Sequence, residues 1–183
     1  MFTTLALVVA VVLAAAAVYA ATRPDTFLVE RSLSIDVAPE VIFSNINDFK
    51  KWSDWSPWDK LDPAMDRHFS GATKGKGAVY AWNGTSKVGS GRMEIIDSVP
   101  FTAIKIKIDF TAPFAASNIV DFTLTKDGDT TLVRWAMSGP QPFISKLMGL
   151  VFSMDKMVGG QFATGLAQLK QISEGTGYTK LMR

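Results

Sequence analysis

The stretch that decides the fold is FISKLMGLVFSMDKMVGGQFATGLAQLKQIS, residues 143–173. Its apolar residues recur every three or four positions, which is the period of an α-helix and makes one continuous apolar stripe. The stripe consists of Leu147, Val151, Met154, Val158, Phe162, Leu166 and Leu169. Gly159 and Gly160 interrupt it, and each glycine costs roughly 1 kcal/mol relative to alanine inside a helix. We therefore predict one long helix, with a strand, an aromatic ring or a ligand lying close to the two glycines.

The chain before this helix, residues 66–138, has the pattern of an antiparallel sheet. Ile104, Ile106, Ile108 and Phe110 alternate with charged residues, which is typical of a strand with one buried face and one face in water. The predicted strands cover residues 67–69, 78–83, 87–97, 101–110, 116–126 and 130–137. Turns are predicted at Asn83-Gly84 and at Asp127-Gly128-Asp129.

Another strand and a set of short helices precede the sheet. In residues 27–35 the apolar residues share one face, which Arg31 interrupts. Ala38-Pro39-Glu40 starts a short helix, because proline suits the first helical turn. Three of the five tryptophans then follow within Trp52-Ser53-Asp54-Trp55-Ser56-Pro57-Trp58-Asp59. Pro57 pushes Ser56 towards extended geometry, so this corner is either the lip of an apolar cavity or a packed joint between helix and sheet.

This order of elements predicts an α+β fold. A curved antiparallel sheet of about seven strands has one buried face, and only the C-terminal helix is long enough to cover it. We expect the sheet to wrap around this helix, with two short helices after the first strand. A cavity is expected between them, because a stiff helix cannot follow a curved surface. Residues 23–26 are then a linker, 27–174 the domain, and 175–183 a loose tail that starts at Gly175-Thr176-Gly177.

The same order resembles the START-like helix-grip superfamily, of the polyketide cyclase/dehydrase and lipid-transport (SRPBCC) type. The resemblance covers residues 26–174. It is carried by Ala38-Pro39-Glu40-Val41-Ile42-Phe43, Asp48-Phe49 to Trp52, Trp55-Ser56-Pro57-Trp58, the glycine-rich strand Gly89-Ser90-Gly91-Arg92-Met93-Glu94-Ile95, and the C-terminal helix. It implies a domain that binds a hydrophobic ligand or lipid, or an aromatase/cyclase-type enzyme that holds a reactive polyketide in shape.

The N-terminal segment is apolar, and Phe2 to Thr22 contains no charged side chain. About 20 helical residues cross a hydrocarbon core of about 30 Å. We therefore expect residues 1–22 to be an uncleaved transmembrane helix, with membrane contact through residues 2–22. The alternative is a removed signal peptide, with Val18-Tyr19-Ala20 as the cleavage site, although a basic n-region is missing. Arg23 and Arg31 favour a cytoplasmic domain by the positive-inside rule, and a periplasmic or extracellular location stays open.

The composition argues against several kinds of site. A net charge of +2 is too small to predict a nucleic-acid partner, and the absence of cysteine excludes disulfides and thiolate chemistry. His68 is the single histidine, so we assign it a surface or structural role and expect no multi-histidine metal site. Four aspartates are interpreted as capping and turn residues, namely Asp54, Asp59, Asp62 and Asp66. We therefore predict no catalytic residue, no metal and no cofactor.

Gly89 and Gly91 lie on one face of the predicted strand 87–97, together with Met93 and Ile95. Glycine inside a strand marks a bend, a bulge or the close approach of another group. Two glycines on the inward face indicate curvature of the sheet, room for a ligand, or both.

The residues predicted to line a cavity are aromatic, methionine and branched aliphatic residues on inward faces. They are Trp55 and Trp58 at the corner, Tyr80, Trp82, Met93, Ile106, Ile108, Phe122, Trp135 and Met137 on strands, and Met154, Val158 and Phe162 on the helix. Methionine adapts its shape to varied ligands, and the Tyr80 hydroxyl and the indole N–H groups are available to orient one. We expect Trp52 to be buried packing, Trp55 and Trp58 to form the entrance, and Arg31 to meet a carboxylate.

These features predict a membrane-anchored protein that binds a hydrophobic small molecule or lipid between sheet and helix. The first alternative is a polyketide cyclase/aromatase-like enzyme, which no acid–base pair in the sequence supports. The second alternative is a non-catalytic partner module whose groove takes a peptide.

Overall fold

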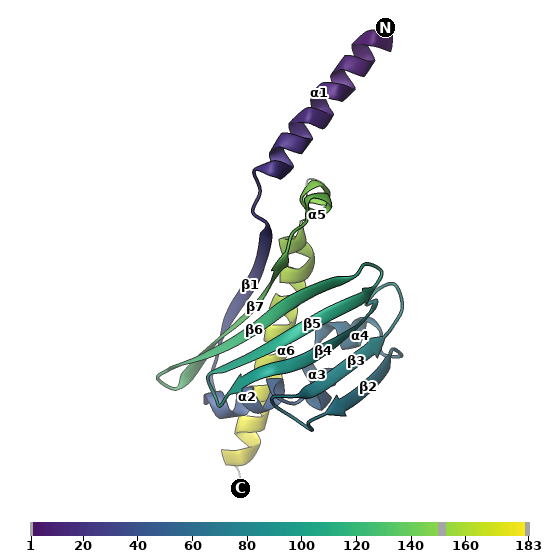
Figure 1. Ribbon diagram of the computed structural model, residues 1–183. Helices are drawn as coiled ribbons and strands as arrows, with labels where there is room; N and C mark the ends of the chain where they lie inside the picture. Colours follow the sequence, from purple (N-terminus) through teal and green to yellow (C-terminus); the bar gives the residue numbers. More distant parts are fainter. Residues whose placement is uncertain (1, 150–152, 182–183) are drawn as a thin grey trace.

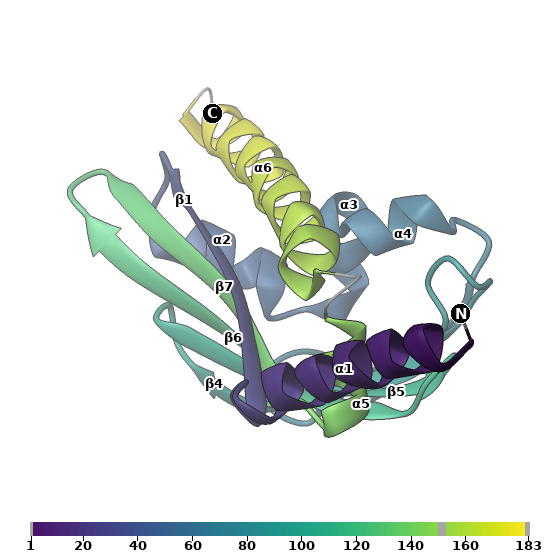
Figure 2. The same cartoon turned by 90° about the horizontal axis from the view of Figure 1, so that it is seen from above.

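The computed structural model describes residues 2–149 and 153–181. In this part of the chain seven strands form one antiparallel sheet, and helix α6 (Met154–Leu181) lies against its concave face (Figure 1). The view from above shows the sheet curving around α6 (Figure 2). The strand order is β1-β7-β6-β5-β4-β3-β2, so β1 and β2 lie at opposite edges. The predicted α+β helix-grip fold is confirmed.

The strands are β1 (Thr26–Ile35), β2 (Asp66–Gly71), β3 (Ala78–Asn83), β4 (Ser90–Val99), β5 (Ala103–Ala112), β6 (Ala116–Asp127) and β7 (Thr130–Pro140). The predicted strand ends differ from these by at most three residues. Where two short helices were expected between β1 and β2, the chain forms α2 (Pro39–Ile46), the 3₁₀ turn η1 (Phe49–Lys51), α3 (Trp52–Trp55) and α4 (Pro57–Leu61). Helix α1 (Phe2–Ala21) precedes β1, and α5 (Phe143–Met148) lies between β7 and α6.

The C-terminal helical region is not the single helix that was predicted. Helix α5 ends with Gly149 at its C-terminal cap, and α6 starts at Met154. Val151 of the predicted stripe lies outside the described residues. The apolar period does not predict a break between α5 and α6. The low helix propensity of Gly149 is consistent with the end of α5 at this residue.

The predicted end of the C-terminal helix at Gly175-Thr176-Gly177 is wrong for the residues that the structure describes. Helix α6 continues through Gly175 and Gly177 to Leu181. Glycine lowers the helix propensity of a segment without forbidding a helix, so Gly175 and Gly177 do not end α6.

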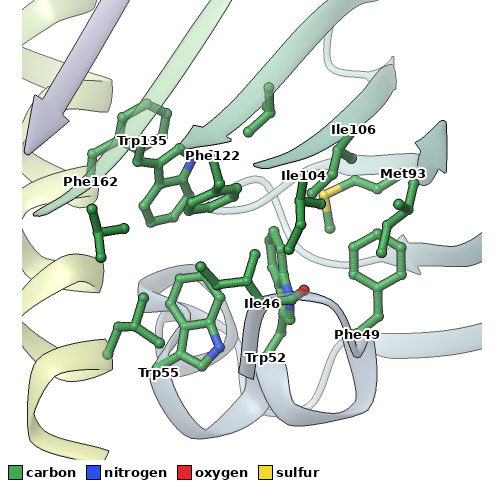
Figure 3. Packing of buried hydrophobic residues seen from close by; sticks show 14 of the residues in the cluster. Ile46, Phe49, Trp52, Trp55, Met93, Ile104, Ile106, Phe122, Trp135 and Phe162 are labelled. Atoms are coloured by element: carbon green, nitrogen blue, oxygen red, sulfur yellow. The ribbon is translucent and has the colours of Figure 1, made fainter. Parts of the chain in front are cut away.

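The core fills the space between the sheet and the helices. On β5 Ile104, Ile106 and Ile108 are buried while the lysines between them are exposed, as their alternation predicted. Aromatic rings from the corner, the sheet and α6 meet at the centre, with neighbouring centroids 4.2–6.4 Å apart (Figure 3). These rings are Trp52, Trp55, Phe122, Trp135 and Phe162.

Helix α1 forms over the range predicted for the apolar N-terminal segment, and it contacts α5. Phe2, Leu5 and Leu7 are exposed on it. Within residues 2–149 and 153–181, however, no helix is found that is both long and apolar enough to cross a membrane. The structure therefore does not support the transmembrane anchor, which was predicted from the apolar run alone.

The connection between β3 and β4 covers residues 84–89, longer than the residues 84–86 left between the predicted strands. The Gly84 N–H donates to the Gly89 carbonyl over 3.0 Å, and Gly89 has a φ of 64°. The Asp62 carboxylate accepts a hydrogen bond from the Thr85 N–H over 2.7 Å and so fixes the loop from outside the hairpin. Gly89 thus belongs to this loop and not to an inward strand face.

Candidate ligand-binding cavity

The tryptophan corner is built by two short helices. Ser56 has extended backbone angles (φ −67°, ψ 125°) and Pro57 starts α4, as the sequence predicted. The indole N–H groups of Trp52 and Trp55 donate to carbonyls at the end of α2, over 2.9 and 3.2 Å. The corner is therefore a packed joint between α2 and the sheet.

The same joint closes one side of a cavity of about 230 Å³ between the sheet and α6. Its wall is mostly aromatic and aliphatic. The corner and the segment after it contribute Trp52, Ser56, Trp58, Asp59 and Met65; the sheet and the β3–β4 loop contribute Tyr80, Trp82, Lys87, Val88, Met93, Ile108, Phe110, Val120, Trp135 and Met137; α6 contributes Val158 and Phe162. Lys87 is exposed, and Trp58 and Val88 are half-buried, so the mouth lies between α4 and this loop.

Nine of the thirteen residues predicted to line a cavity lie in this wall. They are Trp58, Tyr80, Trp82, Met93, Ile108, Trp135, Met137, Val158 and Phe162. Trp55, Ile106 and Phe122 are fully buried and contribute nothing to the wall. Met154 lies at the exposed start of α6.

Trp52 is buried as expected, whereas Trp55 does not lie at the entrance. Trp55 has no exposed surface and its ring lies 5.4 Å from that of Trp135, whereas Trp52 contributes to the cavity wall. Trp58 lies at the mouth, as expected, with its ring 6.1 Å from that of Phe162. Helix α3 is about one turn long, so residues three apart share nearly one face and their spacing does not tell which lies deeper.

Eight wall residues were missed by sequence reasoning, namely Trp52, Ser56, Asp59, Met65, Lys87, Val88, Phe110 and Val120. Phe110 and Val120 have the same strand parity as Ile108 and Phe122, so the alternation contained a signal for them. The loop residue Lys87 had no comparable signal, because its position depends on the conformation of the β3–β4 loop.

One region of the wall is polar. Asp59, 7% exposed, accepts hydrogen bonds on Oδ1 from Arg67 Nε over 2.8 Å and from the Tyr80 hydroxyl over 3.5 Å. Burial, followed by the charge of Asp59, raises the pKa of Tyr80 above its ordinary range, so the hydroxyl stays protonated at neutral pH. The capping role expected for Asp59 is wrong, because this carboxylate is paired with Arg67. Asp62 does hold a turn, through Thr85.

Gly91 and Gly165 make room for two tryptophans of the wall. A Cβ at Gly91 would lie 2.6 Å from the Trp82 ring, and one at Gly165 would lie 2.7 Å from the Trp135 ring. Gly91 thus makes room for the Trp82 ring, and this ring already fills the space beside the glycine. Gly165 was not singled out in the sequence, because only the fold brings Trp135 against it.

Arg31 lies on the inner side of β1 and reaches α6, as expected. Its guanidinium donates to both carboxylate oxygens of Asp155, over 2.8 and 3.0 Å. The group that lies close to Gly159 is this guanidinium, because a Cβ there would lie 2.3 Å from Arg31 Nη2. Of the three approaches expected at the glycine pair, the structure has that of a strand, since Arg31 belongs to β1.

No group of three or more metal-ligating side chains is found among the described residues. His68 is exposed on β2, at the edge of the sheet. The chemistry available in the cavity is therefore apolar contact together with hydrogen bonding at the Asp59 region.

A curved antiparallel sheet that holds a C-terminal helix over an internal cavity defines a helix-grip domain. The chain belongs to the family described as polyketide cyclase / dehydrase and lipid transport, whose model matches residues 26–174. No curated protein gives a significant match to the chain.

Several solved structures share the fold at low sequence identity. A protein from Chromobacterium violaceum is 15% identical with a TM-score of 0.57, over 82% of this chain and 99% of its own. A protein from Mesorhizobium loti is 21% identical with a TM-score of 0.56, over 82% of this chain and 98% of its own. The di-domain ARO/CYC protein StfQ of the steffimycin biosynthetic pathway is 10% identical with a TM-score of 0.59, over 83% of this chain and 52% of its own. These similarities concern the fold alone.

Proposed function

We propose that the protein binds a hydrophobic small molecule in the cavity between the sheet and α6. The observation that carries this proposal is the cavity wall, in which aromatic and methionine side chains surround about 230 Å³. Protein interiors contain few voids larger than a water molecule, so a space of this size at the centre of the fold suits a ligand. Membership of a family whose description includes lipid transport agrees with this function.

The size of the cavity limits what it holds. Ligand pockets usually measure about 300–1,000 Å³, so this one belongs at the small end. Met65, Met93 and Met137 lie in its wall, and methionine side chains change shape at little cost. We infer that the cavity takes a compact ring system, or one section of a longer molecule.

A substitution that fills the cavity tests this proposal. Val120 faces inward and lines the wall, whereas the neighbouring Ile119 faces the other side of β6. We expect Val120→Phe to reduce the amount of small molecule that copurifies with the full-length protein, as measured by native mass spectrometry and solvent extraction. Ile119→Phe is the matched control and should retain it.

Two results would contradict the proposal. Equal ligand content in the Val120→Phe and Ile119→Phe proteins would mean that the ligand binds elsewhere. A ligand-free protein whose tryptophan fluorescence ignores added apolar molecules would mean that the cavity is not a binding site.

A cyclase-type enzyme is the second candidate, and Asp59 and Tyr80 favour it because they bring a carboxylate and a phenol into the wall. Tyr80→Phe removes the phenolic hydroxyl group and keeps the aromatic ring. An enzyme would be supported if the wild type converts a reactive polyketide and the Tyr80→Phe variant binds the polyketide without converting it. Binding without conversion in the wild type would support the binding protein.

We propose separately that α1 attaches the protein to a membrane. The support is its exposed apolar side chains, such as Phe2 and Leu5, and the absence of charge from residues 2–22. An apolar helix face binds a membrane through the apolar area that it buries there, and lysines on that face oppose this burial. The double variant Val8→Lys, Val11→Lys should therefore shift the protein from the membrane fraction to the supernatant, and an unchanged distribution would contradict attachment through α1.

A further inference from the structure

The polar region of the cavity wall has an unused hydrogen-bond acceptor. Arg67 and Tyr80 both donate to Oδ1 of Asp59, over 2.8 and 3.5 Å. The described residues donate no hydrogen bond to Oδ2 of the same carboxylate. Asp59 is 7% exposed and lines the cavity, and Oδ2 is not among the fully buried unpaired side-chain atoms of the described residues, so water in the cavity can reach it. A ligand that displaces this water without offering a donor loses affinity. A donor on the ligand would supply the missing partner.

The charge of this region is already balanced. Arg67 lies 2.8 Å from Asp59 and compensates its negative charge, and Tyr80 is a neutral phenol. An additional full charge brought to this wall would lack a partner, and an unpaired buried charge is costly. A neutral donor therefore suits Oδ2 better than an ammonium group does, and a carboxylate would be repelled by it.

We propose that the ligand is a neutral molecule whose hydroxyl group donates a hydrogen bond to Asp59 Oδ2 while its apolar body packs against the aromatic wall. This inference rests on the proposed function and names its ligand class, an alcohol or phenol built on a compact apolar skeleton. A pure hydrocarbon leaves Oδ2 unpaired. An ionised fatty acid is suited only to the mouth, where Lys87 is exposed.

Four naphthalene derivatives of similar size test the hydroxyl group directly. They are naphthol, methylnaphthalene, naphthoate and naphthylmethylammonium, titrated into the full-length protein at neutral pH by calorimetry. Naphthol and methylnaphthalene have almost the same shape and differ in the hydroxyl group. Hydrogen bonds to charged groups are stronger than those between neutral groups, so we expect naphthol to bind about tenfold more tightly or better.

A pair of aspartate variants locates the effect. Asp59→Asn removes the charge with little change of shape, and Asp54→Asn is the matched control, because Asp54 is exposed on the same corner. Naphthol should lose its advantage over methylnaphthalene in the first variant and keep it in the second. If Asp59→Asn does not fold, the affinities of naphthol and methylnaphthalene for the wild type still decide whether the hydroxyl group strengthens binding.

The outcomes separate this inference from the proposed function. Equal affinity for naphthol and methylnaphthalene overturns the hydroxyl assignment and leaves the cavity as a binding site. Tightest binding of naphthoate, lost in Lys87→Met, overturns it in favour of an anionic ligand at the mouth. Failure of all four probes to bind contradicts the proposed function itself.

Discussion

Single glycines on α6 determine how closely the sheet approaches this helix. Gly165 lets the Trp135 ring lie against the helix, where it stacks on Phe162 with centroids 4.2 Å apart and an interplanar angle of 13°. The Trp135 ring is held on its other sides by Trp55 and Phe122, so it has little freedom to move. Gly160 is exposed, and a Cβ there would have nothing within 4 Å.

Alanine substitutions at these two glycines are expected to have opposite effects. Gly160→Ala should stabilise the protein by up to about 1 kcal/mol, because alanine has the higher helix propensity. Gly165→Ala should destabilise it by about 1–3 kcal/mol, since the added methyl group overpacks the core. Urea unfolding of both variants measures this, and effects of the same sign would contradict the packing described for Trp135.

Strand parity is a local property, and it was sufficient to predict Tyr80, Met93 and Ile108 as wall residues. Asp59 was beyond such reasoning, because its burial depends on Arg67, which returns from β2 to pair with it. The local sequence pattern does not predict the contact between Asp59 and Arg67. Oδ2 of Asp59 can therefore be recognised as a hydrogen-bond acceptor of the cavity wall only from the structure.

At the scale of elements, the pair Arg31–Asp155 connects β1 to the first turn of α6. The hydrogen bonds from Arg31 hold the pKa of Asp155 below its ordinary value of 3.8. A carboxyl group whose folded-state pKa is lowered stabilises the folded protein above the unfolded-state value. It loses this contribution as the pH falls through the folded-state pKa.

We therefore expect a pH-dependent effect of Asp155→Asn. Its urea midpoint should lie slightly below that of the wild type at pH 7, and the difference should shrink as the pH falls through the lowered pKa of Asp155. Asp54→Asn, which removes a carboxylate that has no basic partner among the described residues, is the control and should show little change. A difference for Asp155→Asn that persists at low pH would show that the ion pair is not its cause.

The helical period predicted the part of α6 that covers the sheet, because Phe162, Leu166 and Leu169 all face the core. It did not predict that α5 is a separate helix. Lys146 of α5 pairs with Asp25 over 2.6 Å, and α5 contacts α1. These partners lie more than a hundred residues away in the chain, so the local pattern of α5 carries no sign of them.

At the scale of the whole molecule, the sheet and α6 enclose the cavity together, so a bound molecule should stabilise the entire fold. Binding to the folded state alone adds about 2.7 kcal/mol at a ligand concentration of one hundred times Kd. We expect naphthol to raise the Tm of the wild type and of Ile119→Phe, but not that of Val120→Phe. A rise in all three proteins would contradict binding in the cavity.

The overall architecture was predictable because the order of elements allows only one way to cover the apolar face of the sheet. A long antiparallel sheet with one apolar face needs a cover, and the C-terminal helix is the one element long enough. The cavity followed from this argument as an expectation, and Trp58 was expected at its mouth, whereas Lys87 was not. The mouth depends on the β3–β4 loop and on how Asp62 holds it through Thr85, which is a tertiary contact.

The tryptophans provide the most direct measurement of the central claim, that the cavity binds an apolar ligand. Of the five in the chain, Trp52, Trp58, Trp82 and Trp135 line the cavity and Trp55 does not. Each gives one indole N–H signal in a ¹H–¹⁵N NMR spectrum, assigned by substitution to phenylalanine. On titration with naphthol we predict that the four cavity signals shift while that of Trp55 shifts least. Absence of any shift, or a shift confined to Trp55, would contradict the claim.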